Sequence, residues 1–276
     1  MTRLLEPRAV NAADSRNARH IFVGLPAYNE AEALPSLIKG LHSALRQAGL
    51  EHTLIAVNDG STDSTGAVLD ALAEDYPLHV VHHDRNQNLG GAMRSLFKAA
   101  IERGQVDDVL VCMDADNTFR PEQVPELVAC MTDGVDLTVA SRYVAGGGAV
   151  GVPWYRRLMS SVANQLFRRL LPIAGVSEYT CSFRAYRIGV LRQMKEDHGE
   201  RWVQEDGFSC MPEILVRLSP VLREVRQVSV CIRYDQKLGA SKMNVLRNII
   251  QTLALIRRLR DGRASTAVNS ETVASC

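Results

Sequence analysis

The sequence predicts an α/β fold built on a mostly parallel sheet with helices on its faces. Short apolar runs alternate with segments of helical periodicity through the first half of the chain, which is typical of βαβ units. Of the 276 residues, 46% are apolar, which is enough to bury the core of one substantial domain. Polar loops directly follow three of the apolar runs, as they do at the ligand-binding edge of parallel sheets.

The individual elements follow from their periodicity. Apolar residues recur at the three- and four-residue spacing of a helix between Leu34 and Leu45. Further helices are expected over Thr65–Asp75 and Gly90–Arg103. The short apolar runs around these helices are expected to be strands, and they cover Ile21–Leu25, Leu54–Val57, Leu78–His82, Val109–Met113 and Leu137–Ala140.

Composition limits the class of protein. The formal net charge of +1 argues against a nucleic-acid-binding protein. The six cysteines form no C-x-x-C pair, so they suggest neither a zinc site nor a disulfide framework, and a reducing compartment is expected. No apolar run approaches the roughly 18 residues of a membrane-spanning helix.

The expected domain organisation is simple. Residues 1–20 are polar and are interpreted as a flexible leader, and residues 262–276 as a flexible tail. Residues 21–243 would form one domain, followed by an amphipathic helix over residues 244–261. That last segment and Tyr155–Leu171 both combine an apolar side with several arginines. Such helices bind anionic membrane surfaces. The alternative is that both pack on the core with solvated arginines, and the two interpretations are about even.

Three polar loops are expected to meet in one crevice. The loops Tyr28–Glu30, Asn58–Asp63 and Asp114–Thr118 each follow a predicted strand. Ligands bind at the carboxyl ends of the strands in such sheets, so these loops are candidates for a binding site.

The third loop carries the sequence Asp114-Ala115-Asp116. Alternate carboxylates at a strand end can both reach a divalent cation such as Mg²⁺ or Mn²⁺, which prefers oxygen ligands. A cation there would stabilise the negative charge of a departing diphosphate. The alternative is that two such aspartates occur on a polar loop by chance. In the second loop, Asp59 can accept a hydrogen bond from a uracil or guanine N–H, or the loop is an ordinary turn that caps a helix.

Several motifs together resemble family-2 glycosyltransferases, which have the GT-A fold. Four occur in the family's order: Leu25-Pro26-Ala27-Tyr28-Asn29-Glu30, Val57 to Asp63, Asn88 to Ala92, and Met113 to Asp116. Three later runs resemble the branch that makes polyprenyl-phosphate mannose or glucose: Ala140 to Tyr143, Tyr179 to Tyr186, and Gly239 to Met243. The resemblance covers about Ile21 to Met243.

The resemblance implies roles for particular residues. The nucleotide of the sugar donor, of GDP-mannose or UDP-glucose type, would contact Pro26, Tyr28, Glu30, Asp59, Asp114, Ala115 and Asp116. Asp114 and Asp116 would hold the metal. Arg142 would face the diphosphate or the acceptor phosphate, and the acceptor site would further include Ser182, Arg184, Arg233 and Lys242. The implied reaction is inverting hexose transfer to a polyprenyl phosphate, by a peripheral protein on the cytoplasmic face of a membrane.

Two departures from the family pattern leave alternatives open. Thr118 stands where the mannose synthases carry a longer amide that reaches the metal, so its hydroxyl would need a water to do so. Asp206, in Glu205-Asp206-Gly207-Phe208, stands where hydroxyl-using relatives keep a general base. A phosphate acceptor is already ionised and needs no base, whereas a hydroxyl or a soluble acceptor does. Asp206 is therefore a base in one interpretation and a positioning residue in the other.

Two other classes of protein fit less well. A non-catalytic binding module would be expected to lose Asp114, Asp116, Arg142 or Lys242, and all four are present. A nucleotidyltransferase would open with a Gly-rich basic loop after its first strand, and Pro26 to Glu30 is not such a loop.

Overall fold

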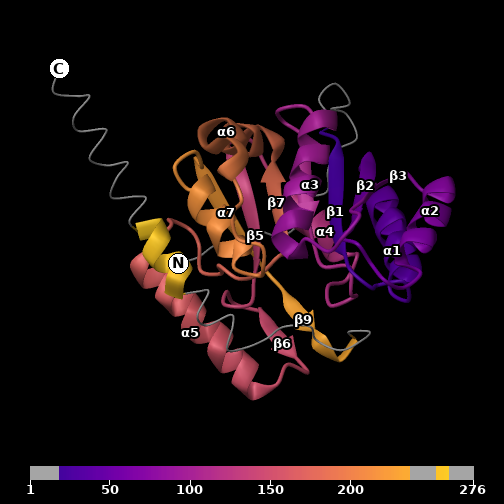
Figure 1. Ribbon diagram of the computed structural model, residues 1–276. Helices are drawn as coiled ribbons and strands as arrows, with labels where there is room; N and C mark the ends of the chain where they lie inside the picture. Colours follow the sequence, from indigo (N-terminus) through magenta and orange to yellow (C-terminus); the bar gives the residue numbers. More distant parts are fainter. Residues whose placement is uncertain (1–18, 237–252, 261–276) are drawn as a thin grey trace.

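The computed structural model describes residues 19–236 and 253–260 (Figure 1). The strands are β1 (Ile21–Ala27), β2 (His52–Asn58), β3 (Leu78–His82), β4 (Val109–Cys112), β5 (Val135–Ser141), β6 (Gly148–Val150), β7 (Arg184–Arg187), β8 (Glu224–Ser229) and β9 (Cys231–Arg233). The helices are α1 (Leu34–Gln47), α2 (Thr65–Asp75), α3 (Asn88–Arg103), α4 (Gln123–Ala129), α5 (Trp154–Leu170), α6 (Ile188–His198) and α7 (Cys210–Leu218), and residues 253–260 are also helical.

Seven strands form the main sheet in the order β3-β2-β1-β4-β7-β5-β8. All neighbours pair in parallel except β7, which is antiparallel to both β4 and β5. The expected mostly parallel α/β fold is therefore confirmed. The antiparallel strand β7 was not predicted. It lies between β4 and β5 in the sheet.

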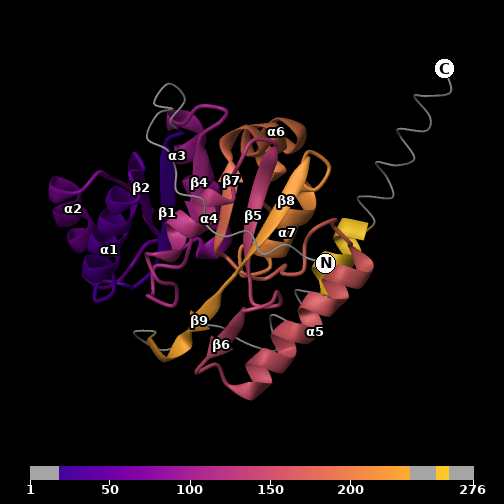
Figure 2. The same ribbon diagram turned by 180° about the vertical axis from the view of Figure 1, so that it is seen from behind.

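The side chains of each strand alternate between the two faces of the sheet, so the core consists of two layers, one on each face. In β1, Val23 and Leu25 pack on the layer that contains α1 and α4, whereas Phe22 packs on the layer of α3, α6 and α7. Successive strand residues point to opposite faces of a sheet, so a strand buried on both faces is apolar throughout. Figures 1 and 2 show these two groups of helices on opposite faces of the sheet.

Helix α5 and residues 253–260 lie side by side at one end of the molecule in both views (Figures 1 and 2). A second, two-stranded sheet of β6 and β9 lies beside α5. Residues 253–260 are attached to the core, because Leu255, Ile256 and Leu259 are buried there. Among the described residues, no helix has both the length and the hydropathy to cross a bilayer.

Candidate active site

A crevice of about 1170 Å³ lies at the carboxyl ends of β1, β2 and β4. The loops that follow these strands line it, as the sequence predicted. It brings together the residues Pro26, Tyr28, Glu30, Asp59, Asp114, Ala115, Asp116 and Thr118. Arg142, Ser182 and Asp206 line the same crevice. Most of the residues that the sequence selected are therefore neighbours in space.

Hydrogen bonds tie the first two of these loops together. Asn29 adopts a left-handed conformation with φ of 54°, and its N–H donates to the Ser61 hydroxyl at 3.0 Å. The Asn29 side-chain oxygen in turn accepts from the Thr62 N–H at 2.8 Å. The Glu30 N–H donates to the Thr65 hydroxyl at 2.8 Å. The loops after β1 and β2 therefore form one connected wall of the crevice.

The carboxylate of Asp59 is oriented by hydrogen bonds to His83 and Gln87, which were not among the predicted site residues. Its Oδ1 lies 2.7 Å from His83 Nδ1 and accepts the Gln87 N–H at 2.8 Å. The other ring nitrogen of His83 lies 2.7 Å from the Ser95 hydroxyl. Both bonds to Asp59 use Oδ1, so Oδ2 is the oxygen that can accept from a ligand in the crevice. No sequence motif marked His83, which lies in a polar stretch just after β3.

Asp116 is only 7% exposed and is oriented by its own loop. Its Oδ1 accepts both the Thr118 hydroxyl, at 2.6 Å, and the Thr118 N–H, at 3.1 Å. Thr118 therefore holds this carboxylate in place. Within residues 19–236 and 253–260, no three or more acidic, His or Cys side chains form a metal-binding group. Mg²⁺ is commonly bound by one or two carboxylates together with substrate phosphates, so Asp114 and Asp116 fit such an ion.

Arg142 is mostly buried and makes an ion pair with Glu178, which is fully buried. Its Nε donates to Glu178 Oε2 at 2.8 Å, and its Nη2 to Glu178 Oε1 at 3.0 Å. Burial alone would lower the pKa of the guanidinium, but the charge and hydrogen bonds of Glu178 outweigh this effect and raise the pKa. Arg142 therefore carries a permanent positive charge at the crevice.

Arg156 of α5 is a second cation that lines the crevice, and the sequence analysis did not select it as a site residue. Its Nη1 donates to the Tyr234 hydroxyl at 3.0 Å. The signal in the sequence was weak, because Arg156 was one of several arginines on an amphipathic helix. Together Arg142 and Arg156 place two guanidinium groups at the crevice, whose N–H groups are suited to phosphate oxygens.

Two residues expected at the acceptor site, Arg184 and Arg233, do not line the crevice. Arg184 is fully buried in β7, and it donates to the carbonyls of Met211 and Tyr179 at 2.8 and 2.7 Å. It therefore supports the segment that carries Ser182 and does not reach a ligand. Arg233 does not line the crevice and is paired with Asp235 at 2.7 Å. Lys242 lies outside the described residues.

The segment with Glu205 and Asp206 borders the crevice and is anchored by several elements. The Gly90 N–H at the start of α3 donates to the Asp206 carbonyl at 2.7 Å. The buried Glu213 of α7 accepts the N–H groups of Gln204 and Glu205 at 2.9 and 2.7 Å. Arg258, from the helix at residues 253–260, pairs with Glu205. The Asp206 side chain itself is 66% exposed, with Arg94 at 3.3 Å.

One part of the crevice is apolar. Its residues come from α5, from residues 253–260 and from the segment after Asp206, and they include Leu158, Val162, Leu166, Phe208 and Leu253. Leu158, Val162, Phe208 and Leu253 are each about half exposed. The apolar side of α5 thus faces a cavity and solvent, with only Asn164 and Phe167 of the helix fully buried.

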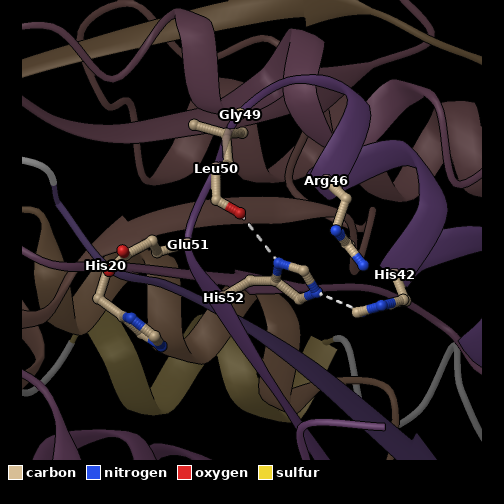
Figure 3. Close-up of a pocket in the computed structure, with 7 residues that line it drawn as sticks. All are labelled: His20, His42, Arg46, Gly49, Leu50, Glu51 and His52. Carbon is tan, nitrogen blue, oxygen red and sulfur yellow. Dashed lines mark hydrogen bonds between the residues drawn. The ribbon is translucent and has the colours of Figure 1, made fainter.

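A separate hollow lies at the opposite end of the sheet, where β1 and β2 begin (Figure 3). His42 Nδ1 lies 3.0 Å from His52 Nε2, and His52 Nδ1 lies 2.9 Å from the Leu50 carbonyl. Figure 3 shows these three groups in a chain beside Arg46. None of the candidate site residues lines this hollow.

The crevice has the layout of an enzyme that binds a nucleotide at the edge of a parallel sheet, and comparison with known proteins identifies the family. Residues 22–194 match the model of glycosyl transferase family 2, and the chain belongs to this family. It is 39% identical over 234 residues to polyprenol monophosphomannose synthase of Mycolicibacterium smegmatis, covering 84% of each chain. It is 34% identical to undecaprenyl-phosphate mannosyltransferase of Micrococcus luteus, covering 80% of this chain and 86% of that protein.

Solved structures show the same fold at lower identity. Glucosyl-3-phosphoglycerate synthase from Mycobacterium tuberculosis, in complex with Mn²⁺, UDP and glucosyl-3-phosphoglycerate, superposes with a TM-score of 0.59. The sequences are 22% identical, and the match covers 87% of this chain and 77% of that one. The fold is therefore GT-A, as the sequence motifs implied.

Proposed function

We propose that this glycosyltransferase moves a hexose from a nucleotide sugar to a polyprenyl phosphate at a membrane surface, with inversion at the anomeric carbon. The observation that supports this most is the make-up of one crevice. It combines the carboxylates Asp59, Asp114 and Asp116, the cations Arg142 and Arg156, and an apolar lining from α5 and residues 253–260. A nucleotide sugar, a phosphate and a lipid chain need these three kinds of surface.

The donor side of the proposal rests on the loops after β1, β2 and β4. Asp59 Oδ2 would accept a base N–H, and Asp114 and Asp116 would hold Mg²⁺ or Mn²⁺ against the diphosphate. The bound ion would neutralise the charge that develops on the leaving nucleotide. Two of the similar proteins are named for mannose transfer, which favours a mannosyl donor over a glucosyl one.

The acceptor side rests on the two arginines and the apolar lining. A phosphate monoester is already anionic near neutral pH, so Arg142 and Arg156 would orient it, and no base would be needed to form the nucleophile. Cys181 also lines the crevice, but burial raises the pKa of its thiol to about 12, so the thiol stays protonated. Direct attack of the acceptor on the anomeric carbon, with no enzyme nucleophile, would give inversion.

Sugar transfer from radiolabelled GDP-mannose and UDP-glucose to farnesyl phosphate, with farnesol as the neutral comparison, tests the proposal. We expect product with farnesyl phosphate and one of the two donors, and little with farnesol. Equal transfer to both acceptors would refute the phosphate specificity.

A hydroxyl acceptor is the second candidate, because Asp206 lines the crevice with an exposed carboxylate that could serve as a base. Asp206→Asn separates the two chemistries in a single-turnover experiment with saturating donor. Loss of a general base costs roughly 10²–10⁴-fold in rate, whereas a phosphate acceptor predicts a much smaller loss in the chemical step. A hundredfold slower step with unchanged donor affinity would favour the hydroxyl acceptor.

A further inference from the structure

The contacts of Arg142 leave one part of its guanidinium for a ligand. A guanidinium has five N–H donors. Glu178 takes Nε and Nη2 in a two-point pair, and Nη2 also donates to the hydroxyls of Ser160 and Thr180 at 3.1 and 3.0 Å. None of the hydrogen bonds that Arg142 makes to residues 19–236 or 253–260 uses Nη1. Because Arg142 lines the crevice, Nη1 is the group that can donate to a bound anion.

Glu178 is itself held firmly. Its side chain is fully buried, and its Oε1 accepts both the Thr180 hydroxyl at 2.8 Å and the Thr180 N–H at 3.0 Å. A buried carboxylate is costly unless it is paired and hydrogen-bonded, and here both conditions are met. A long arginine side chain next to such an anchor loses its alternative rotamers, so its direction is set before any ligand arrives.

The arrangement also links Arg142 to the helix that lines the apolar part of the crevice. Ser160 lies on α5 between Leu158 and Val162, which both line that part. The Ser160 hydroxyl contacts Arg142 Nη2, so the cation and the apolar lining are fixed relative to each other. An acceptor with an anionic head and an apolar chain would meet both at once.

We propose that Glu178 is a positioning residue, which fixes the Arg142 guanidinium so that Nη1 donates to a phosphate oxygen of the acceptor. This inference rests on the proposed function, because it assumes a phosphate acceptor. Glu178 does not touch the substrate and acts only through Arg142. The same carboxylate leaves Arg142 only Nη1 for the ligand, so a second cation, Arg156, is needed to bind the other phosphate oxygens.

The test measures kcat and KM for farnesyl phosphate in Glu178→Gln, Arg142→Ala and the double variant. Arg142 that is no longer held in place should lose a charge-assisted hydrogen bond to the phosphate, so we expect KM for farnesyl phosphate to rise at least about tenfold in Glu178→Gln. Affinity for the nucleotide, from titration in the presence of Mn²⁺, should stay within about twofold, because Glu178 does not line the donor loops. Glu224→Gln is the matched control, since it removes an exposed carboxylate from Arg226 outside the crevice.

The double variant separates positioning from a general structural role. If Glu178 acts through Arg142, its replacement should add less than about threefold to the defect of Arg142→Ala, because coupled residues are not additive. Should Glu178→Gln fail to fold, Glu178→Asp keeps the buried charge and shortens its reach, and KM should then lie clearly above that of the wild-type protein.

The outcomes are distinct. An unchanged KM in the folded Glu178 variants, or a full additional loss in the Arg142→Ala background, would overturn the positioning role and leave the proposed function standing. Wild-type protein that transfers equally well to farnesyl phosphate and farnesol would overturn the proposed function, and this inference with it.

Discussion

At the scale of single residues, the site depends on carboxylates whose directions are set by their neighbours. Asp59 is held by His83 and Gln87, and Asp116 by Thr118. The contacts of Asp59 use Oδ1 and leave Oδ2 to a ligand, whereas the Thr118 hydroxyl and N–H both donate to Asp116 Oδ1. Groups that are oriented before the ligand binds lose little freedom on binding, which favours affinity and rate.

Asp116→Asn should reduce sugar transfer by about 10²–10³-fold, the range for loss of one group that stabilises transition-state charge. The amide keeps the size of the side chain and can still accept from Thr118, so the fold should survive. Transfer rates with Mn²⁺, together with thermal unfolding, check this. Asp75→Asn at the exposed end of α2 is the control. Full activity of Asp116→Asn, or of the wild-type protein in excess EDTA, would contradict the metal assignment.

At the scale of elements, the first turn of α3 lies very close to the segment that contains Glu205 and Asp206. A Cβ added at Gly90 would lie 1.8 Å from the Glu205 carbonyl oxygen. The Gly90 N–H also donates to the Asp206 carbonyl. Asn88, two residues earlier, has a φ of 60°, which turns the chain sharply into the helix. Helix α3 therefore sets the position of Asp206.

Gly90→Ala should destabilise the protein by roughly 1–3 kcal/mol or more, because the methyl group clashes with backbone atoms that cannot rotate away. Sugar transfer should fall as the Asp206 segment is displaced. Denaturant unfolding and steady-state rates measure the two effects. Gly148→Ala is the control, since a Cβ there meets nothing within 4 Å. Equal stability and equal sugar transfer in the two variants would show that the Asp206 segment can move to accommodate the methyl group, and would contradict this prediction.

The elements also show what the sequence could and could not predict. The parallel strands β1 to β5 and helices α1 to α3 follow from apolar periodicity, and so did the crevice at their carboxyl ends. Strand β7 was missed because it is only four residues long and includes Arg184 and Arg187, which a pattern analysis places in solvent. Both are buried, and main-chain carbonyls accept from Nη1 and Nη2 of Arg184 and from Nε and Nη2 of Arg187. The family resemblance assigned Arg184 to the acceptor site, and its burial in β7 keeps it from a ligand there.

At the scale of the whole molecule, α5 and residues 253–260 would bring the crevice to a membrane. Both helices combine exposed apolar residues with arginines, and both line the crevice.

Replacing the exposed Leu158 and Val162 of α5 by Ser should weaken flotation with liposomes that contain anionic lipid. Val106→Ser is the control, since Val106 is equally exposed but does not line the crevice. Binding should also fall with salt, because screening acts over about 8 Å at physiological ionic strength. Wild-type protein that fails to float with any lipid would contradict this.

The stability of the whole molecule should fall between pH 7.5 and pH 5.5. The pKa values of His42, His79 and His198 are all lowered, in each case first by burial and then by neighbouring positive groups. At these three histidines the folded state therefore binds fewer protons than the unfolded state in this window, so their contribution to stability rises with pH and is lost as pH falls below the ordinary histidine value. For His42 the neighbours are His52 and Arg46, both in the hollow of Figure 3.

Denaturant unfolding at pH 7.5 and pH 5.5 measures the change in stability. His42→Gln removes one of the three groups, so its pH dependence should be shallower than that of the wild-type protein. An identical dependence, or a wild-type protein more stable at pH 5.5, would contradict the assignment.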